Sequence, residues 1–153
     1  MLYTYQICTV VAITVALVIA TYFDCKGGTI PIFLFPILPA IILSLSIASG
    51  QINIVNSLIG LLIGAVTFWA LAFFFDGGGG DIVMMSVLGW CLGVRGIIIL
   101  ILASSVIYAV FATIVIGVYA IKKRAKEALK KQYPFAPFVL TGFFACLLFG
   151  WLL

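Results

Sequence analysis

Apolar residues occur in long runs along this chain, separated by short polar or glycine-rich stretches. The runs are continuous, which predicts membrane-spanning helices of about 20 residues, whereas the strands of a membrane β-barrel would alternate. The pattern therefore predicts an all-α polytopic bundle with six transmembrane segments, folded as one domain over residues 1–153. The six predicted segments are residues 2–23, 32–49, 54–75, 82–92, 97–121 and 135–153.

The fourth predicted segment is too short to cross a membrane alone. Its 11 residues give about 17 Å of helix, against a hydrocarbon core of about 30 Å. A run of four glycines, bracketed by Asp76 and Asp81, precedes it, and residues 93–96 break the apolar pattern after it. We expect the glycine-rich loop to dip into the membrane, where irregular backbone is tolerated if protein or a water-filled cavity covers it.

The composition and charge of the chain agree with a multi-pass protein of the cell membrane. Of the 153 residues, 66% are hydrophobic and 8% are charged, with a mean hydropathy of +1.41. The net charge is +4, and most basic residues lie in residues 122–131. The positive-inside rule explains this charge without a nucleic-acid partner. It predicts that Lys26, the glycine-rich loop and the basic segment face the cytoplasm, with both termini outside and the lipid bilayer as a partner.

The chain has few groups that could bind a metal ion or act as a nucleophile. Histidine is absent, and the four cysteines form no C-x-x-C pair. The missing histidines exclude Ser-His-Asp and Cys-His catalytic pairs and every histidine metal site, and the cysteine spacing disfavours zinc. We predict that the protein uses no metal and no cofactor.

Two aspartates at segment ends are the candidate catalytic residues. Asp24 ends the first segment, where the helix dipole disfavours a negative charge, and Asp81 begins the fourth, where it could also serve as a helix cap. Two carboxylates brought close together cannot both ionise, so one can act as a general acid and the other as a base on a bound water. Such a pair predicts an aspartyl peptidase. The residues expected to give a substrate strand access to it are Gly78, Gly79 and Gly80.

Other interpretations of these acids remain open at the level of sequence. Asp76 is expected to be an exposed loop acid, the alternatives being that it tunes the pKa of Asp81 or contacts a basic leader. The alternative function is a small proton-coupled transporter that uses Asp24 and Asp81, since isolated acids in membrane helices often carry protons. A non-catalytic scaffold would leave the glycine run without an evident purpose.

Three motifs give the chain a resemblance to the prepilin peptidase family, the type IV leader peptidases. Residues 78–81 match the G-x-G-D pattern of membrane aspartyl peptidases, and Asp24 is followed after five residues by Ile30-Pro31, which resembles that family's first-aspartate motif. The third motif resembles the family's P-F-x-P-F element and reads Tyr133-Pro134-Phe135-Ala136-Pro137-Phe138.

The resemblance implies a single transmembrane peptidase domain that removes the cytoplasmic leader of type IV pilin-like (prepilin) precursors. Asp24 and Asp81 would be its catalytic pair. The first span begins at once in this sequence. The chain therefore resembles the short form of the family, without the amino-terminal methylase domain.

Overall fold

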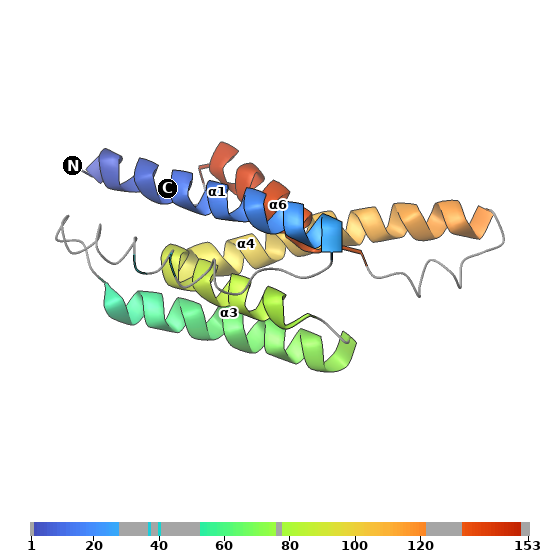
Figure 1. Ribbon diagram of the computed structural model, residues 1–153, viewed down its shortest axis with the longest axis horizontal. Helices are drawn as coiled ribbons and strands as arrows, with labels where there is room; N and C mark the ends of the chain where they lie inside the picture. Colours follow the sequence, from blue (N-terminus) through green and yellow to red (C-terminus); the bar gives the residue numbers. More distant parts are fainter. Residues whose placement is uncertain are drawn as a thin grey trace.

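The computed structural model describes residues 2–27, 37, 40, 53–75, 78–121 and 133–150. These residues form four helices and no strand, and the helices pack side by side as an elongated bundle (Figure 1). The helices are α1 (Leu2–Gly27), α3 (Ile54–Phe75), α4 (Gly79–Ile121) and α6 (Ala136–Leu148). Three of them, α1, α3 and α4, are long and apolar enough to cross a membrane. The expectation of an all-helical membrane protein is confirmed.

The predicted count of six separate segments is wrong for the described part of the chain, which has four helices. The predicted second segment, residues 32–49, lies outside the described residues apart from Ile37 and Ala40. The predicted fourth and fifth segments form one element, α4, and the break expected at residues 93–96 is a single non-helical residue, Gly93. The last segment is also shorter than expected, because α6 has 13 residues, or about 20 Å of helix.

The chain turns back at Gly93, so that the two halves of α4 run in roughly opposite directions (Figure 1). Gly93 has a φ of 69°, a left-handed conformation that favours glycine. The N–H of Val94 donates to Oδ1 of Asn56, at 3.3 Å, so a side chain of α3 caps the second half of α4. The predicted reversal of direction between residues 82–92 and 97–121 is therefore present, and a sharp bend produces it.

The first half of α4 (residues 79–92) packs closely against α3 through glycines. A Cβ atom placed on Gly60, Gly64 or Gly89 would come closer than 3.0 Å to the backbone of the facing helix. Small residues spaced four apart, as Gly60 and Gly64 are, allow such backbone contact between membrane helices. This interface fixes the short first half of α4, which carries Asp81 at its start.

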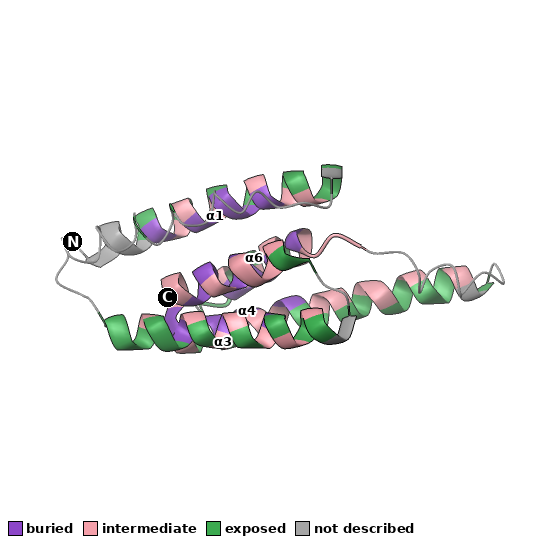
Figure 2. Ribbon diagram, turned by 60° about the horizontal axis from the view of Figure 1, so that its bottom comes forward, coloured by how far each residue is buried: buried purple, intermediate pink, exposed green. Residues whose placement is uncertain are grey.

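The buried core is formed by α1, both halves of α4 and α6, where Figure 2 shows the buried faces. Apolar residues on one stripe of α1 belong to the same buried cluster as the inner face of α4 and the buried side of α6. The largest fully buried side chains include Ile13, Leu17, Met84, Met85, Leu88, Val139 and Phe143. The opposite faces are apolar but exposed, as expected for a surface covered by lipid.

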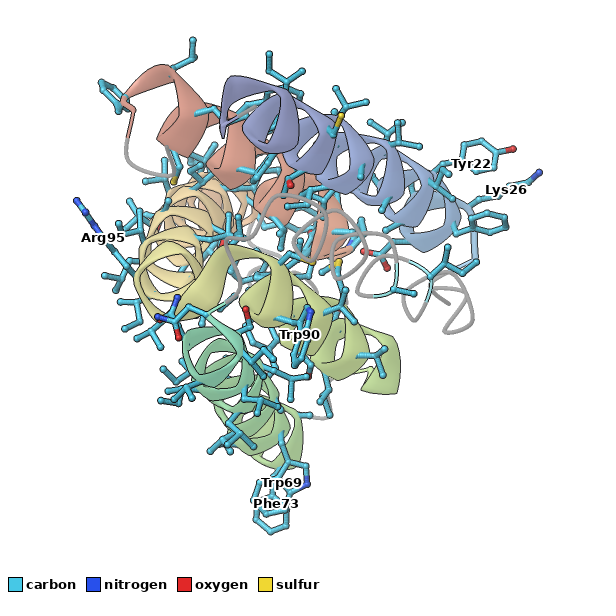
Figure 3. The ribbon with its side chains drawn as sticks, turned by 90° about the vertical axis from the view of Figure 1, so that its left-hand side faces the viewer. Tyr22, Lys26, Trp69, Phe73, Trp90 and Arg95 are labelled. Carbon is cyan, nitrogen blue, oxygen red and sulfur yellow. The ribbon has the colours of Figure 1, made fainter. Side chains whose placement is uncertain are left out.

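Charged and aromatic side chains mark the outside of the bundle. In Figure 3, Tyr22 and Lys26 point away from α1, and Trp69 and Phe73 point outward from α3. The Lys26 ammonium donates to the Tyr22 hydroxyl, at 3.2 Å. Lys26 lies in the last turn of α1 beside Asp24, whereas Arg95 follows the bend at Gly93 in α4. Aromatic and basic side chains in such positions are typical of membrane interfaces.

Candidate active site

Asp24 lies in the last turn of α1, and its carboxylate reaches the start of α6. The N–H of Ala136 donates to Oδ2 of Asp24, at 2.9 Å. The carboxyl end of its own helix disfavours a negative charge at Asp24, but the amino end of α6, with its free N–H group and positive dipole, favours one. The apparent mismatch of an aspartate at this helix end is resolved by a helix that begins 112 residues later in the sequence.

The start of α6 offers a single N–H group to that carboxylate. The N–H groups of Phe138 and Val139 both donate to the carbonyl of Phe135, at 3.0 and 3.3 Å. Pro134 and Pro137 have no N–H, and Phe135, at the N-cap position, has no side-chain acceptor. The Ala136 N–H is therefore left for Asp24. Sequence reasoning noted the P-F-x-P-F element but did not assign Ala136 this role; the prolines, which suit a helix start, were the available signal.

A group of aromatic rings, here called the aromatic clamp, holds the start of α6 in place. The ring of Phe135 contacts Phe68 of α3 and Tyr108 of α4, with centroids 5.3 and 5.8 Å apart. The ring of Phe138 contacts Tyr108 and Phe111. The full clamp is Phe68, Tyr108, Phe111, Tyr133, Phe135 and Phe138. Ring contacts of this kind contribute about 0.5–1.5 kcal/mol each beyond area burial, so the clamp fixes the donor that faces Asp24.

Asp81 lies in the first turn of α4, which begins at Gly79 and not at Asp81 as expected. Its N–H donates to the carbonyl of Gly78, at 3.1 Å, while its side-chain Oδ1 is buried and has no hydrogen-bond partner. The Oδ1 atom of Asp81 therefore caps no helix. Asp81 lies at the start of an inner stripe of α4. The stripe continues with the buried residues Met84, Met85 and Leu88.

The structure brings the two acids close enough for the charge of Asp24 to act on Asp81. They come from different helices and have different surroundings. Asp24 accepts a backbone hydrogen bond at a helix start, and Asp81 has an oxygen enclosed by protein with no donor. An asymmetric pair of carboxylates can divide the roles of general base and general acid.

The backbone next to Asp81 is open on the glycine side. A Cβ atom placed on Gly78 or Gly79 would meet no atom within 4 Å. Gly80 follows within the first turn of α4, and Asp76 lies outside the described residues. Because only Gly78 of the loop before α4 is described, the expected dip of that loop into the membrane stays a prediction.

No group of three or more His, Cys, Asp or Glu side chains comes together to hold a metal ion within the described ranges. All four cysteines are free thiols.

The fold is that of a helical membrane protein, and two carboxylates lie within electrostatic reach of each other at one end of its bundle. A sequence profile of the type IV leader peptidase family matches residues 11–113, which is more than half of the chain and includes both acids and the glycines. The chain belongs to the type IV leader peptidase family, and the predicted family is confirmed. Neither a curated protein nor a solved structure matches the chain.

Proposed function

We propose that this protein is an intramembrane aspartyl endopeptidase that removes the leader of type IV pilin-like precursors, with Asp24 and Asp81 as its catalytic pair. The observation that carries the proposal is that these two carboxylates, from separate helices and in contrasting surroundings, lie within electrostatic reach of each other. Membership of a peptidase family favours this function over a proton-coupled transporter that uses the same two acids.

The surroundings of the two acids support a division of roles. Asp24 is the general base, because the Ala136 N–H and the start of α6 stabilise its negative charge. Asp81 is the general acid, because a buried carboxyl oxygen without a donor favours the neutral form next to a second carboxylate. The pair holds one proton between two carboxylates, as peptide hydrolysis by this mechanism needs.

The chemical step follows from these roles. Asp24 takes a proton from a bound water, the water oxygen forms a bond to the scissile carbonyl carbon, and Asp81 gives its proton to the carbonyl oxygen. The resulting diol then collapses. Its hydroxyl proton returns to Asp81, Asp24 passes its proton to the amide nitrogen, and the C–N bond breaks. Water is consumed and both acids recover their starting states.

The open backbone at Gly78 and Gly79 supports an approach of the substrate strand from this side. A peptide must lie extended beside the acids for its carbonyl to reach them, and side chains on these glycines would occupy that space. Gly80 completes the proposed access stretch, within the first turn of α4.

We infer that the acids face the cytoplasm and lie below the membrane surface. Tyr108 of the aromatic clamp contacts Phe135, and the next residue, Ala136, donates to Asp24. Tyr108 and Asp24 therefore lie at about the same level along the bundle axis. Beyond Tyr108, α4 continues through 13 more residues to Ile121, an apolar extension of about 20 Å that projects past the other helices (Figure 1). Paramagnetic relaxation from a lipid-headgroup label would contradict this depth if a probe at Gly79 lay level with the headgroups.

The first test is co-expression of the chain with a pilin-like precursor, followed by a gel-shift assay for loss of the leader. The intact chain should shorten the precursor, and Asp24→Asn and Asp81→Asn should leave it uncut. Asp76→Asn serves as the matched control, because we expect an exposed acid to be dispensable. Proton flux in reconstituted vesicles, with the precursor unchanged, would favour the transporter instead.

A further inference from the structure

Two buried side-chain oxygens in the described part of the chain have no hydrogen-bond partner, Oδ1 of Asp81 and Oγ1 of Thr21. A buried hydroxyl left unpaired costs about 1–3 kcal/mol, so folded proteins rarely contain one without a reason. Thr21 lies three residues before Asp24 in α1, which places the two side chains on the same face of that helix.

The hydroxyl of Thr21 differs from other hydroxyls in these helices. A hydroxyl in an apolar helix commonly donates to the carbonyl one turn earlier. Thr14 does so to Val10, at 2.7 Å, and Ser86 does so to Ile82, at 2.6 Å. Thr21 could donate in the same way to Leu17, but its hydroxyl does not. It is therefore available to a group that is not part of its own helix.

The inner stripe of α1 directs Thr21 toward the two acids. Ile13, Leu17 and Ala20 on this stripe are fully buried against the core. The stripe ends with Thr21 and Asp24, and Asp24 lies within electrostatic reach of Asp81. The two unpartnered oxygens thus belong to the two helices that carry Asp24 and Asp81.

We propose that Thr21 is a third polar side chain of the active site, whose hydroxyl holds the attacking water; this rests on the proposed peptidase function. The Thr21 hydroxyl donates to the water oxygen, and the water donates one hydrogen to Asp24 and the other to Oδ1 of Asp81. The remaining lone pair of the water points at the scissile carbonyl carbon. Three fixed hydrogen bonds orient the nucleophile, and such positioning lowers the barrier of the chemical step.

The test compares hydroxyl-free and hydroxyl-bearing variants of the purified protein in lipid nanodiscs. The substrate is the pilin-like precursor that the intact chain cleaves in co-expression. Thr21→Val keeps the shape of the side chain and should lower kcat by about 10- to 100-fold with KM little changed. Thr21→Ser keeps the hydroxyl and should retain most of the activity. Thr21→Ala is a second hydroxyl-free variant, in case valine disturbs packing.

Thermal unfolding separates this role from a structural one. Removing an unpaired buried hydroxyl should leave Tm unchanged or raise it, so Thr21→Val should be slower yet at least as stable. The matched control is Thr14→Val, two turns earlier on the same helix face, where the hydroxyl is already bonded within the helix. This control should leave kcat unchanged.

The possible failures of this proposal and of the catalytic pair are distinguishable. If Thr21→Val and Thr21→Ala cleave within twofold of the intact chain while Asp24→Asn and Asp81→Asn do not cleave, the role of Thr21 is wrong and the acid pair stands. If the two asparagine variants cleave normally, the proposed function itself fails. A lower Tm with equal loss of activity in Thr21→Ser would indicate a structural role only.

Discussion

Glycine has opposite uses at the interface of α3 with α4 and at the acid end of the bundle. At the interface, Gly60, Gly64 and Gly89 let two backbones touch, and no side chain fits there. At the acid end, Gly78 and Gly79 face open space. The first region is packed as tightly as backbone allows, whereas the second contains open backbone and buried oxygens without partners. The difference indicates that one region supplies rigidity, whereas the other leaves open space beside the proposed catalytic pair.

The largest effect is expected from Gly89→Val. Its side chain would press into the backbone of α3 at Gly60, and overpacking at a backbone contact should cost about 3 kcal/mol or more, enough to prevent folding. Yield and thermal unfolding in detergent measure this. Gly117→Val in the same helix is the control, because a Cβ atom there meets nothing within 4 Å. Equal stability of the two variants would show that the α3–α4 contact is not tight.

A smaller effect on stability is expected at Asp24, the proposed general base, whose carboxylate accepts a hydrogen bond from α6. Asp24→Ala should lower stability by about 1 kcal/mol, because the Ala136 N–H loses its acceptor. Asp24→Asn keeps an oxygen that can accept this bond and should unfold close to the intact chain. Neither variant should cleave the precursor. Thermal unfolding in the same detergent compares the stability of the two variants. An Asp24→Asn variant less stable than Asp24→Ala would argue against a stabilising hydrogen bond from Ala136.

The smallest effect on stability is expected at the open glycines. Gly79→Ala should unfold at the same temperature or slightly higher, because alanine is favoured over glycine in a helix by up to about 1 kcal/mol. Cleavage should nevertheless slow, with kcat/KM reduced about 10-fold, if the substrate strand lies against this backbone. Kinetics with the purified protein measure this. Full activity in Gly79→Ala and in the bulkier Gly79→Val would remove the proposed access path.

Much of the bundle could be predicted because the local signals are strong. The apolar run over residues 54–75 predicts α3 with its exact bounds, and the run over residues 2–23 predicts α1 except for its last turn, which continues to Gly27. The break expected over residues 93–96 is a bend at Gly93 alone, and the sequence does not reveal that Asn56 caps the helix after it. Contacts between residues far apart in the chain decide such details.

Part of the candidate site could also be predicted from strong local signals. Asp24 and Asp81 stand out as acids at the ends of apolar runs, and the structure places them within reach of each other. The start of α6 was not predicted as the partner of Asp24, since a backbone N–H carries no sequence signal beyond the flanking prolines. In the sequence, nothing distinguishes Thr21 from other helical threonines. Only the structure shows that its buried hydroxyl has no hydrogen-bond partner.

A double-mutant cycle on the two acids is the most direct test of the catalytic pair. The intact protein, Asp24→Asn, Asp81→Asn and the double variant are compared in nanodiscs by kcat/KM on the cleaved precursor. Residues that act as one unit are not additive. Each single variant should therefore lose about 10³-fold or more, and the double variant should be no worse than either. A single variant with full activity, or losses that multiply in the double variant, would contradict a shared two-carboxylate mechanism.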